Sequence, residues 1–370
     1  MNNKQRMEAA LRGDPVDRPP IWLREGFDFI HGPHRWLGWQ ADPIYRELWE
    51  FACPWCATVE GWSAGSHFNR FLGIPPDRIK SRVVAMPDGS VRNHGEIDTP
   101  KGKLHFLTER RPGENTSWTL KHAVETMSEL EMLRSVPWEL APVSLESYHR
   151  AKERVGDQGV LRMGLSSPIV CISGAMNFEM FLELAGTEKA LFHELLEEIT
   201  RRFLFAVEAI FASGPLETTA NLGGSEQCTP PMMRPEAFDE YVIPYDGKLV
   251  QALRRHGVCV NMHCHGKIRH ALRCMREMGL DSTDPVEPPP GGDLSIAEAR
   301  EIAGDRLTLI GNLQFGELEY AEPERIRRRV REILATGERR LVLAASAGPI
   351  SRVSSRLAAN IRAWIETALE

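Results

Sequence analysis

The most regular pattern in the chain is an alternation of short apolar runs with longer amphipathic segments, which begins near residue 150. Short apolar runs are typical of buried parallel strands, and a period of 3.6 residues indicates helices. The predicted strands are 160–165, 216–222, 258–263, 280–283, 307–311 and 341–345, and the predicted helices are 187–212, 235–256, 267–278, 295–303, 323–335 and 354–369. Ser295-Ile296-Ala297-Glu298 is a capping-box sequence and defines one helix start well.

Two earlier apolar runs, 21–23 and 57–62, bring the predicted parallel strands to eight. Eight strands that alternate with helices predict a closed (β/α)8 barrel, whereas six would also suit a doubly wound sheet. No G-x-G-x-x-G motif follows a strand, which disfavours a dinucleotide-binding sheet. We therefore expect a TIM-type α/β barrel in which residues 1–370 form a single domain.

Residues 81–110 interrupt this alternation with a different pattern. Apolar residues there occur at alternate positions, and turn sequences separate them at 87–89 and 99–102. This combination predicts antiparallel hairpins, so we expect an inserted β-ribbon in the N-terminal half that ends near residue 115.

The stretch from Gly257 to Gly266 contains the most informative side chains of the chain. Because strand side chains alternate between two faces, His263 and His265 are predicted to point the same way. On an apolar opposite face lie Val258, Val260, Met262 and Cys264. Two imidazoles on one face can bind one metal ion. The alternative is that one histidine bonds a carbonyl group and the other lies at a solvated rim.

A barrel carries its active site at the carboxyl ends of its strands, and several polar residues follow predicted strands there. Glu226 is our preferred third metal ligand, with Glu287 as the alternative. Two histidines and a carboxylate leave an open position for water or a thiol. Arg24 can clamp a carboxylate with two hydrogen bonds, or it can pair within the protein, for example with Glu25.

Composition narrows the class of protein. The hydrophobic content of 42% and charged content of 26% are typical of a globular protein. The net charge of −6 argues against a nucleic-acid-binding protein, and no apolar run predicts a membrane span. Seven cysteines, an odd number, together with an N-terminus that lacks a signal peptide, predict a cytoplasmic protein.

Several motifs in order resemble the uroporphyrinogen decarboxylase superfamily over nearly the whole chain. They comprise Asp17-Arg18-Pro19-Pro20-Ile21-Trp22-Leu23-Arg24, Met180-Phe181-Leu182, Gly186-Thr187-Glu188, Pro244-Tyr245, His263-Cys264-His265-Gly266, Gly311-Asn312 and Gly348-Pro349. The resemblance implies a (β/α)8 barrel, often paired as a homodimer. It covers both decarboxylases, which use no metal, and cobalamin-linked methyltransferases, which hold zinc.

The sequence departs from both branches. Tetrapyrrole-binding arginines of the decarboxylases are replaced by Arg24-Glu25-Gly26-Phe27-Asp28, where the second arginine is missing. The methyltransferases bind zinc through His-x-Cys and a distant Cys, where this chain has His265 and Ala347. We therefore expect an atypical member of the superfamily. Its imidazole and carboxylate ligands would be harder than the thiolates of the methyltransferases and would favour harder metal ions.

The resemblance and the histidine pair together predict a metal-dependent methyltransferase that works with a corrinoid protein. His263, His265 and Glu226 would hold a divalent ion, for which we expect zinc. Arg24 and Asn312 would orient a small-molecule substrate, with Trp22 and Gln314 also contacting it. The alternative is a decarboxylase, a lyase, that acts on a carboxylated pyrrole or aromatic compound.

Overall fold

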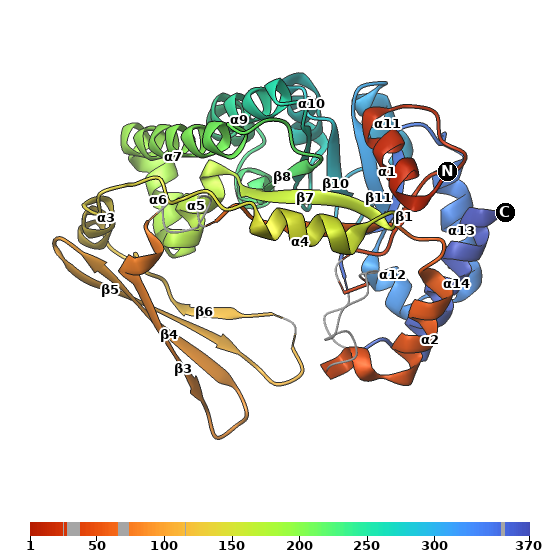
Figure 1. Ribbon diagram of the computed structural model, residues 1–370, viewed down its shortest axis with the longest axis horizontal. Coiled ribbons are helices and arrows are strands. Elements are labelled where there is room, and N and C mark those ends of the chain that lie inside the picture. The colour runs from red at the N-terminus through yellow and green to blue at the C-terminus, as the bar shows by residue number, and fades with distance from the viewer. Residues whose placement is uncertain (25, 28–37, 66–73, 115, 349–351) are drawn as a thin grey trace.

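The computed structural model describes residues 1–370 except 25, 28–37, 66–73, 115 and 349–351. Its centre is a parallel sheet with the strand order β1-β12-β11-β10-β9-β8-β7-β2 (Figure 1). An isolated parallel bridge joins Ile21 of β1 to Cys56, just before β2, so the sheet is nearly closed into a barrel. These strands are β1 (Ile21–Trp22), β2 (Thr58–Trp62), β7 (Gly159–Ser166), β8 (Thr219–Gly223), β9 (Cys259–His263), β10 (Ser282–Val286), β11 (Thr308–Leu313) and β12 (Leu341–Ala345).

Helices surround the barrel on its outer face (Figure 1). The α-helices are α1 (Asn3–Arg12), α2 (Pro43–Ala52), α3 (Met127–Arg134), α4 (Glu146–Val155), α5 (Pro168–Ala175), α6 (Phe178–Thr187), α7 (Lys189–Ile210), α8 (Ala237–Tyr241), α9 (Ile243–Arg255), α10 (Arg269–Met278), α11 (Ile296–Ala303), α12 (Phe315–Tyr320), α13 (Pro323–Leu334) and α14 (Ser355–Leu369). Three short 3-10 helices are η1 (Gly38–Ala41), η2 (Pro76–Arg78) and η3 (Ser225–Cys228). No helix in the described part of the chain is long and apolar enough to cross a membrane.

The eight predicted strands coincide with the eight parallel strands, with ends that differ by a few residues. The capping box is confirmed, since the Ser295 side chain accepts from the Glu298 backbone and Glu298 caps Ser295 in return. The helix predicted for 235–256 is instead two helices, α8 and α9. Pro244 lies in the first turn of α9, where a missing N–H is tolerated, so it favours a new helix start there.

The inserted segment is larger than predicted. It forms an antiparallel sheet of four strands: β3 (Ile79–Ala85), β4 (Val91–Thr99), β5 (Gly102–Arg110) and β6 (Trp118–Lys121). Figure 1 shows this sheet extending away from the barrel. The prediction that it ends near residue 115 is wrong, because β6 follows. Three of the four β6 side chains are exposed, so this strand lacks the apolar alternation that marks a half-buried strand.

The N-terminal helix α1 packs against one end of the barrel. Its residues Met7, Ala10 and Leu11 form a buried cluster with the barrel residues Trp22 and Ile310. Thr308 Oγ1 at the start of β11 also donates to the Ala10 carbonyl at 2.8 Å. Since β11 begins at Thr308, α1 covers the amino ends of the strands and leaves the carboxyl ends for the candidate site.

Candidate functional site

His263 is the last residue of β9, and His265 follows it by two positions. Their rings pack edge to face, with centroids 4.7 Å apart. The intervening Cys264 is fully buried in the main hydrophobic core. The two imidazoles therefore lie side by side at the carboxyl end of the barrel, as the alternation of strand side chains predicts.

Each imidazole contacts a carboxylate from the β10 segment. His263 Nδ1 lies 3.0 Å from Oδ2 of Asp284, and His265 Nδ1 lies 3.2 Å from Oε2 of Glu287. The Gly266 backbone N–H also donates to Oε2 of Glu287, at 2.8 Å. The register explains the first pair, because Asp284 is the residue of β10 directly beside His263. Both rings are thus oriented through Nδ1.

Asp284 is fully buried and also accepts from Arg24, with 2.6 Å between Nη1 and Oδ2. Asn261 of β9 donates to the other carboxylate oxygen. The Arg24 guanidinium lies 4.9 Å from the Trp22 ring centroid, and the Arg162 guanidinium lies 5.0 Å from it. Arg24 therefore pairs within the protein, as one of the two alternatives expected.

Charges around the two carboxylates set their protonation. Burial alone would raise the pKa of Asp284, but the charge of Arg24 and the hydrogen bond with His263 hold that pKa well below its usual value. Burial likewise opposes ionisation of Glu287, yet hydrogen bonds from His265 and the Gly266 N–H lower its pKa. Burial alone would lower the pKa of His265, but Glu287 and the charge of Glu226 raise it. Both carboxylates are therefore anions near neutral pH.

Glu226 lies in η3, directly after β8, and is half-buried. Its Oε2 atom is buried and has no hydrogen-bond partner among the described residues. The Gly224 N–H donates to the His263 carbonyl at 3.1 Å, which ties the end of β8 to the end of β9. A buried carboxylate oxygen without a donor, close enough to act electrostatically on His265, is suited to a cation.

The other predicted site residues are placed differently. Asn312 is buried, donates to the Val286 carbonyl at 2.7 Å and accepts from Arg329 of α13 at 3.2 Å. Its amide is thus already hydrogen-bonded to β10 and an outer helix. Trp22 packs in the cluster with α1, and Gln314 Oε1 is buried without a partner among the described residues. Substrate roles for these three residues stay predictions. Glu25, Asp28 and Pro349 lie outside the described residues.

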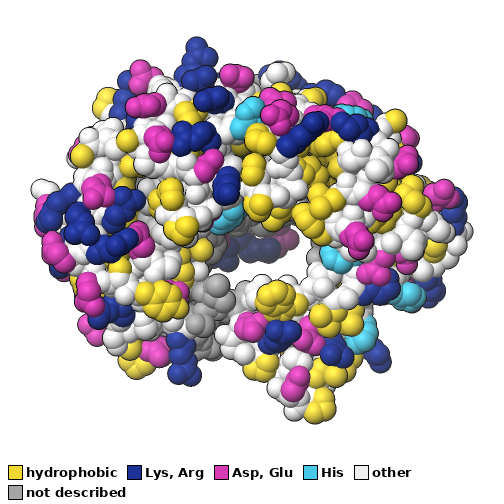
Figure 2. Space-filling view, turned by 180° about the vertical axis from the view of Figure 1, so that it is seen from behind, with side chains coloured by type: hydrophobic (Ala, Val, Ile, Leu, Met, Phe, Trp, Pro, Cys, Tyr) yellow, Lys and Arg dark blue, Asp and Glu magenta, His cyan; other side chains and the backbone are white. Residues whose placement is uncertain are grey.

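The molecule is hollowed between the barrel and the antiparallel sheet. Figure 2 shows this hollow from the side opposite to Figure 1, with Lys or Arg and Asp or Glu side chains visible inside it. A substrate that approaches there would meet charged groups.

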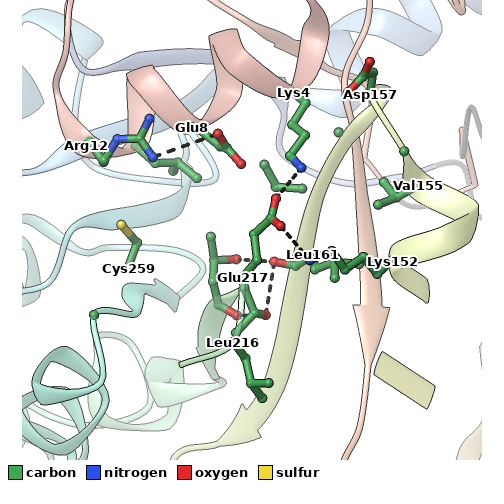
Figure 3. Close-up of a pocket in the computed structure, with 17 residues that line it drawn as sticks. Lys4, Glu8, Arg12, Lys152, Val155, Asp157, Leu161, Leu216, Glu217 and Cys259 are labelled. Atoms are coloured by element: carbon green, nitrogen blue, oxygen red, sulfur yellow. Dashed lines mark hydrogen bonds and ion pairs between the residues drawn. The ribbon is translucent and has the colours of Figure 1, made fainter. Parts of the chain in front are cut away.

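A separate cavity of about 360 Å³ lies at the amino end of the barrel, beside α1 (Figure 3). Glu217 pairs there with Lys4 and, at 2.8 Å, with Lys152. These hydrogen bonds, with Lys152 first, lower the pKa of Glu217. Its charged side chains pair with one another, and active sites of such barrels lie at the opposite end, so this cavity is not the candidate site.

One group of side chains on the outer helices was not predicted. Asp239, His270 and Cys274 have ligand atoms that all lie within 4.8 Å of one another, which no other set of three or more His, Cys, Asp or Glu does among the described residues. The signal was present, since His270 and Cys274 are four positions apart and share one helix face. His263, His265 and Glu226 do not meet this criterion in the present side-chain arrangement.

A nearly closed parallel barrel with charged and imidazole groups at the carboxyl ends of its strands defines a TIM-type barrel enzyme. The family model for "Uroporphyrinogen decarboxylase (URO-D)" matches residues 111–369. The chain belongs to this family, and its relatives indicate an enzyme of the decarboxylase or methyltransferase type.

The relatives include both types of enzyme. A uroporphyrinogen decarboxylase of Trichormus variabilis is 23% identical over 335 residues, covering 87% of this chain and 84% of the relative. The methylcobamide:CoM methyltransferase MtaA of Methanosarcina barkeri is 26% identical over 179 residues, covering 46% of this chain and 48% of the relative. A methyltransferase structure from Methanosarcina mazei has a TM-score of 0.60 at 17% identity and covers 99% of both chains, which supports the fold. These low identities agree with a family member that is not a typical uroporphyrinogen decarboxylase.

Proposed function

We propose that the protein is a metal-dependent methyltransferase that exchanges a methyl group with a corrinoid protein. The observation that carries this proposal is the orientation of the two imidazoles. Each holds a carboxylate at Nδ1, and no described residue hydrogen-bonds to Nε2 of either ring. A histidine that binds a metal through one nitrogen usually donates from the other to a carboxylate or carbonyl.

The donor types of the residues present suit a divalent ion, which would bring the three ligand atoms closer together than they lie in the structure. His263 and His265 would bind through Nε2, and the buried Oε2 of Glu226 would supply the third ligand. Nitrogen and oxygen donors suit zinc, although they are harder than thiolates. When bound, the ion would lower the pKa of a thiol or water substrate and so favour its nucleophilic form.

The chain's own residues would orient this centre and keep its charge balanced. Asp284 holds His263 in the Nδ1-protonated tautomer, while Arg24 keeps Asp284 ionised. Glu287 does the same for His265. Because both carboxylates are fixed by other donors, the imidazoles keep their orientation without the ion.

Two further features belong to this proposal. Charged groups in the hollow of Figure 2 would meet the small substrate, and the antiparallel sheet beside the hollow would contact the corrinoid protein. The whole chain would act as one domain, with a homodimer as the assembly that the family resemblance suggests.

The alternative is a decarboxylase, which is favoured by the relatives that align along most of the chain. In that case Arg24 and Arg162 would bind substrate carboxylates, and His263 would donate or accept a proton. Arg24 is, however, already paired with Asp284.

The decisive experiment compares bound zinc and methyl transfer in two double variants. His263→Ala with His265→Ala should lose one equivalent of zinc and transfer from methylcobalamin to a small thiol. His94→Ala with His105→Ala, which removes two exposed imidazoles of the antiparallel sheet, should retain both. Unchanged zinc content in the first variant would overturn the proposal. Turnover of uroporphyrinogen by the metal-free protein would establish the decarboxylase instead.

A further inference from the structure

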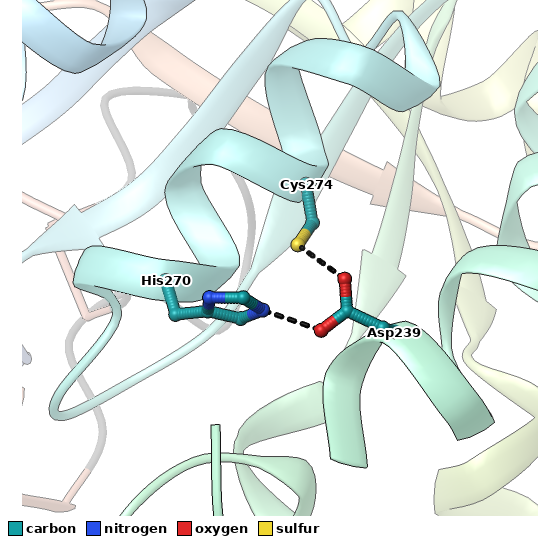
Figure 4. Close-up of side chains that lie close together, drawn as sticks. All are labelled: Asp239, His270 and Cys274. Atoms are coloured by element: carbon teal, nitrogen blue, oxygen red, sulfur yellow. Dashed lines mark hydrogen bonds and ion pairs between the residues drawn. The ribbon is translucent and has the colours of Figure 1, made fainter. Parts of the chain in front are cut away.

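Asp239, His270 and Cys274 lie together between two outer helices (Figure 4). His270 and Cys274 are one turn apart on α10, and Asp239 faces them from α8. His270 Nε2 lies 2.5 Å from Oδ2 of Asp239, and Cys274 Sγ lies 3.7 Å from Oδ1. One nitrogen, one sulfur and a carboxylate therefore converge on a common point.

The charge environment of Asp239 differs from that of its neighbour Glu240. Glu240 pairs with Lys189 at 2.7 Å and with Arg234 at 3.3 Å. Among the described residues, no lysine or arginine pairs with Asp239, whose only ion-pair partner is His270. The carboxylate is thus left without a permanent cation beside it.

Two of the three side chains are partly exposed, so a metal ion could enter this group directly from solvent. The side chains of Asp239 and His270 are 47% and 35% exposed, whereas Cys274 is 3% exposed. Burial, with the charge of Asp239, raises the pKa of the Cys274 thiol to about 12. Without a metal the sulfur is therefore protonated and unreactive at neutral pH.

We propose that Asp239, His270 and Cys274 form a second metal site, separate from the histidine pair, for a thiophilic divalent ion such as Zn²⁺. Sulfur and nitrogen donors exclude Mg²⁺ and Ca²⁺, which prefer oxygen. On binding, the thiol proton leaves to solvent and a sulfur–metal bond forms. His270 binds through Nε2 as the Nδ1-protonated tautomer. Three protein ligands leave a fourth, solvent-facing position for water.

The two helices of this site adjoin the segments that carry Glu226 and His265 at the mouth of the barrel. Helix α8 follows the segment that carries Glu226, and α10 begins four residues after His265. An ion held by both helices would join these two segments on the outside of the barrel. We expect it to stabilise the protein whether or not the histidine pair binds metal.

Cobalt titration of the chelator-treated full-length protein, kept reduced with a phosphine, tests the proposal. Co²⁺ bound by a thiolate has a near-ultraviolet charge-transfer band that histidine and carboxylate ligands do not produce. The wild type should show this band, and Cys274→Ser should lose it. His270→Gln, a change at a part-exposed side chain, should weaken Co²⁺ binding at least about tenfold. Loss of a residue that only hydrogen-bonds to a metal ligand already lowers metal affinity about 10- to 100-fold, and loss of a ligand should cost at least as much.

Two controls separate this site from the others. Cys53→Ser, which removes a half-buried cysteine of another helix end, should retain the band. His263→Ala with His265→Ala should also retain it, so loss of zinc from the histidine pair and loss of this site are distinguishable. Absence of the band in the wild type, or its persistence in Cys274→Ser, would overturn the second site.

Discussion

Arg24 and Asp284 are 260 residues apart in the chain and form a buried ion pair, with 2.6 Å between Nη1 and Oδ2. Arg24 follows β1 and Asp284 lies within β10, and the strands β12 and β11 lie between these two in the sheet. His263 shares the same carboxylate oxygen at 3.0 Å. The pair therefore links the carboxyl end of β1 to the orientation of one candidate metal ligand on β9.

Removing this carboxylate should destabilise the protein strongly. Asp284→Asn removes a fully buried carboxylate charge that pairs with Arg24 and contacts His263, so we expect the free energy of unfolding to fall by about 3–5 kcal/mol. Urea unfolding measures this change. Glu146→Gln, which breaks an exposed pair with Arg150, should cost less than about 1 kcal/mol.

The same pair should resist acid. Because the pKa of Asp284 is lowered in the folded protein, its contribution is complete above the unfolded pKa and is lost only as pH falls through the folded value. The stability difference between wild type and Asp284→Asn should thus stay constant from neutral pH down to about pH 5. A difference that shrinks between pH 7 and pH 5 would contradict this ion pair.

Asp246 should have the opposite effect on stability. It is fully buried in α9, accepts from Ser167 Oγ at 2.9 Å, and burial raises its pKa to about 7. A folded pKa above the unfolded value means that stability is greatest in acid and falls as pH rises to about 7. The free energy of unfolding of Asp246→Asn, relative to that of the wild type, should therefore rise by roughly 2–4 kcal/mol from pH 5 to pH 8. Urea unfolding of both proteins at the two pH values measures this change. An unchanged difference would contradict the raised pKa.

A glycine at the start of β7 is required by close packing. A Cβ on Gly159 would lie 1.7 Å from the Thr58 carbonyl oxygen, which belongs to the backbone of β2 and cannot move aside. Gly159→Ala should destabilise the barrel by about 3 kcal/mol or more. Gly164 of the same strand is the matched control, because a Cβ added there would meet no neighbouring atom within 4 Å. Gly164→Ala should therefore cost little in thermal unfolding.

Metal removal should lower thermal stability in two separable parts. An ion that binds only the folded protein stabilises it by about 2.7 kcal/mol per site when the free ion concentration is about 100 times the Kd. Zinc added to the chelator-treated wild type should raise Tm by about twice as much as zinc added to Cys274→Ser or to His263→Ala with His265→Ala. Equal increases in all three proteins would contradict both sites.

The strands of the barrel could be predicted because each is a short apolar run, and the pairing of His263 with His265 follows from strand alternation. The partners of those imidazoles could not be predicted. Asp284 lies beside His263 because of the register between β10 and β9, which neither strand encodes alone. Asn312 illustrates the same limit, since its contact with Arg329 depends on how α13 packs on β11.

The group on the outer helices was missed for a related reason. Spacing places His270 and Cys274 on one face of α10, but only the packing of α8 against α10 brings Asp239 to them. The fourth antiparallel strand was missed because its side chains are mostly exposed, so hydrogen bonding to β5 defines it and hydrophobic pattern does not.

Cys264 lies between the two histidines in sequence and is buried on the other side of the segment. Asn261 of β9 is held in register by Asn221 of β8 and Ser282 of β10. A shift of one residue along these neighbours would turn the thiol toward the barrel mouth and both imidazoles away from it. Strand alignment would therefore select which metals the proposed centre can accept, and an insertion or deletion early in β9 would change that selection without altering any ligand residue.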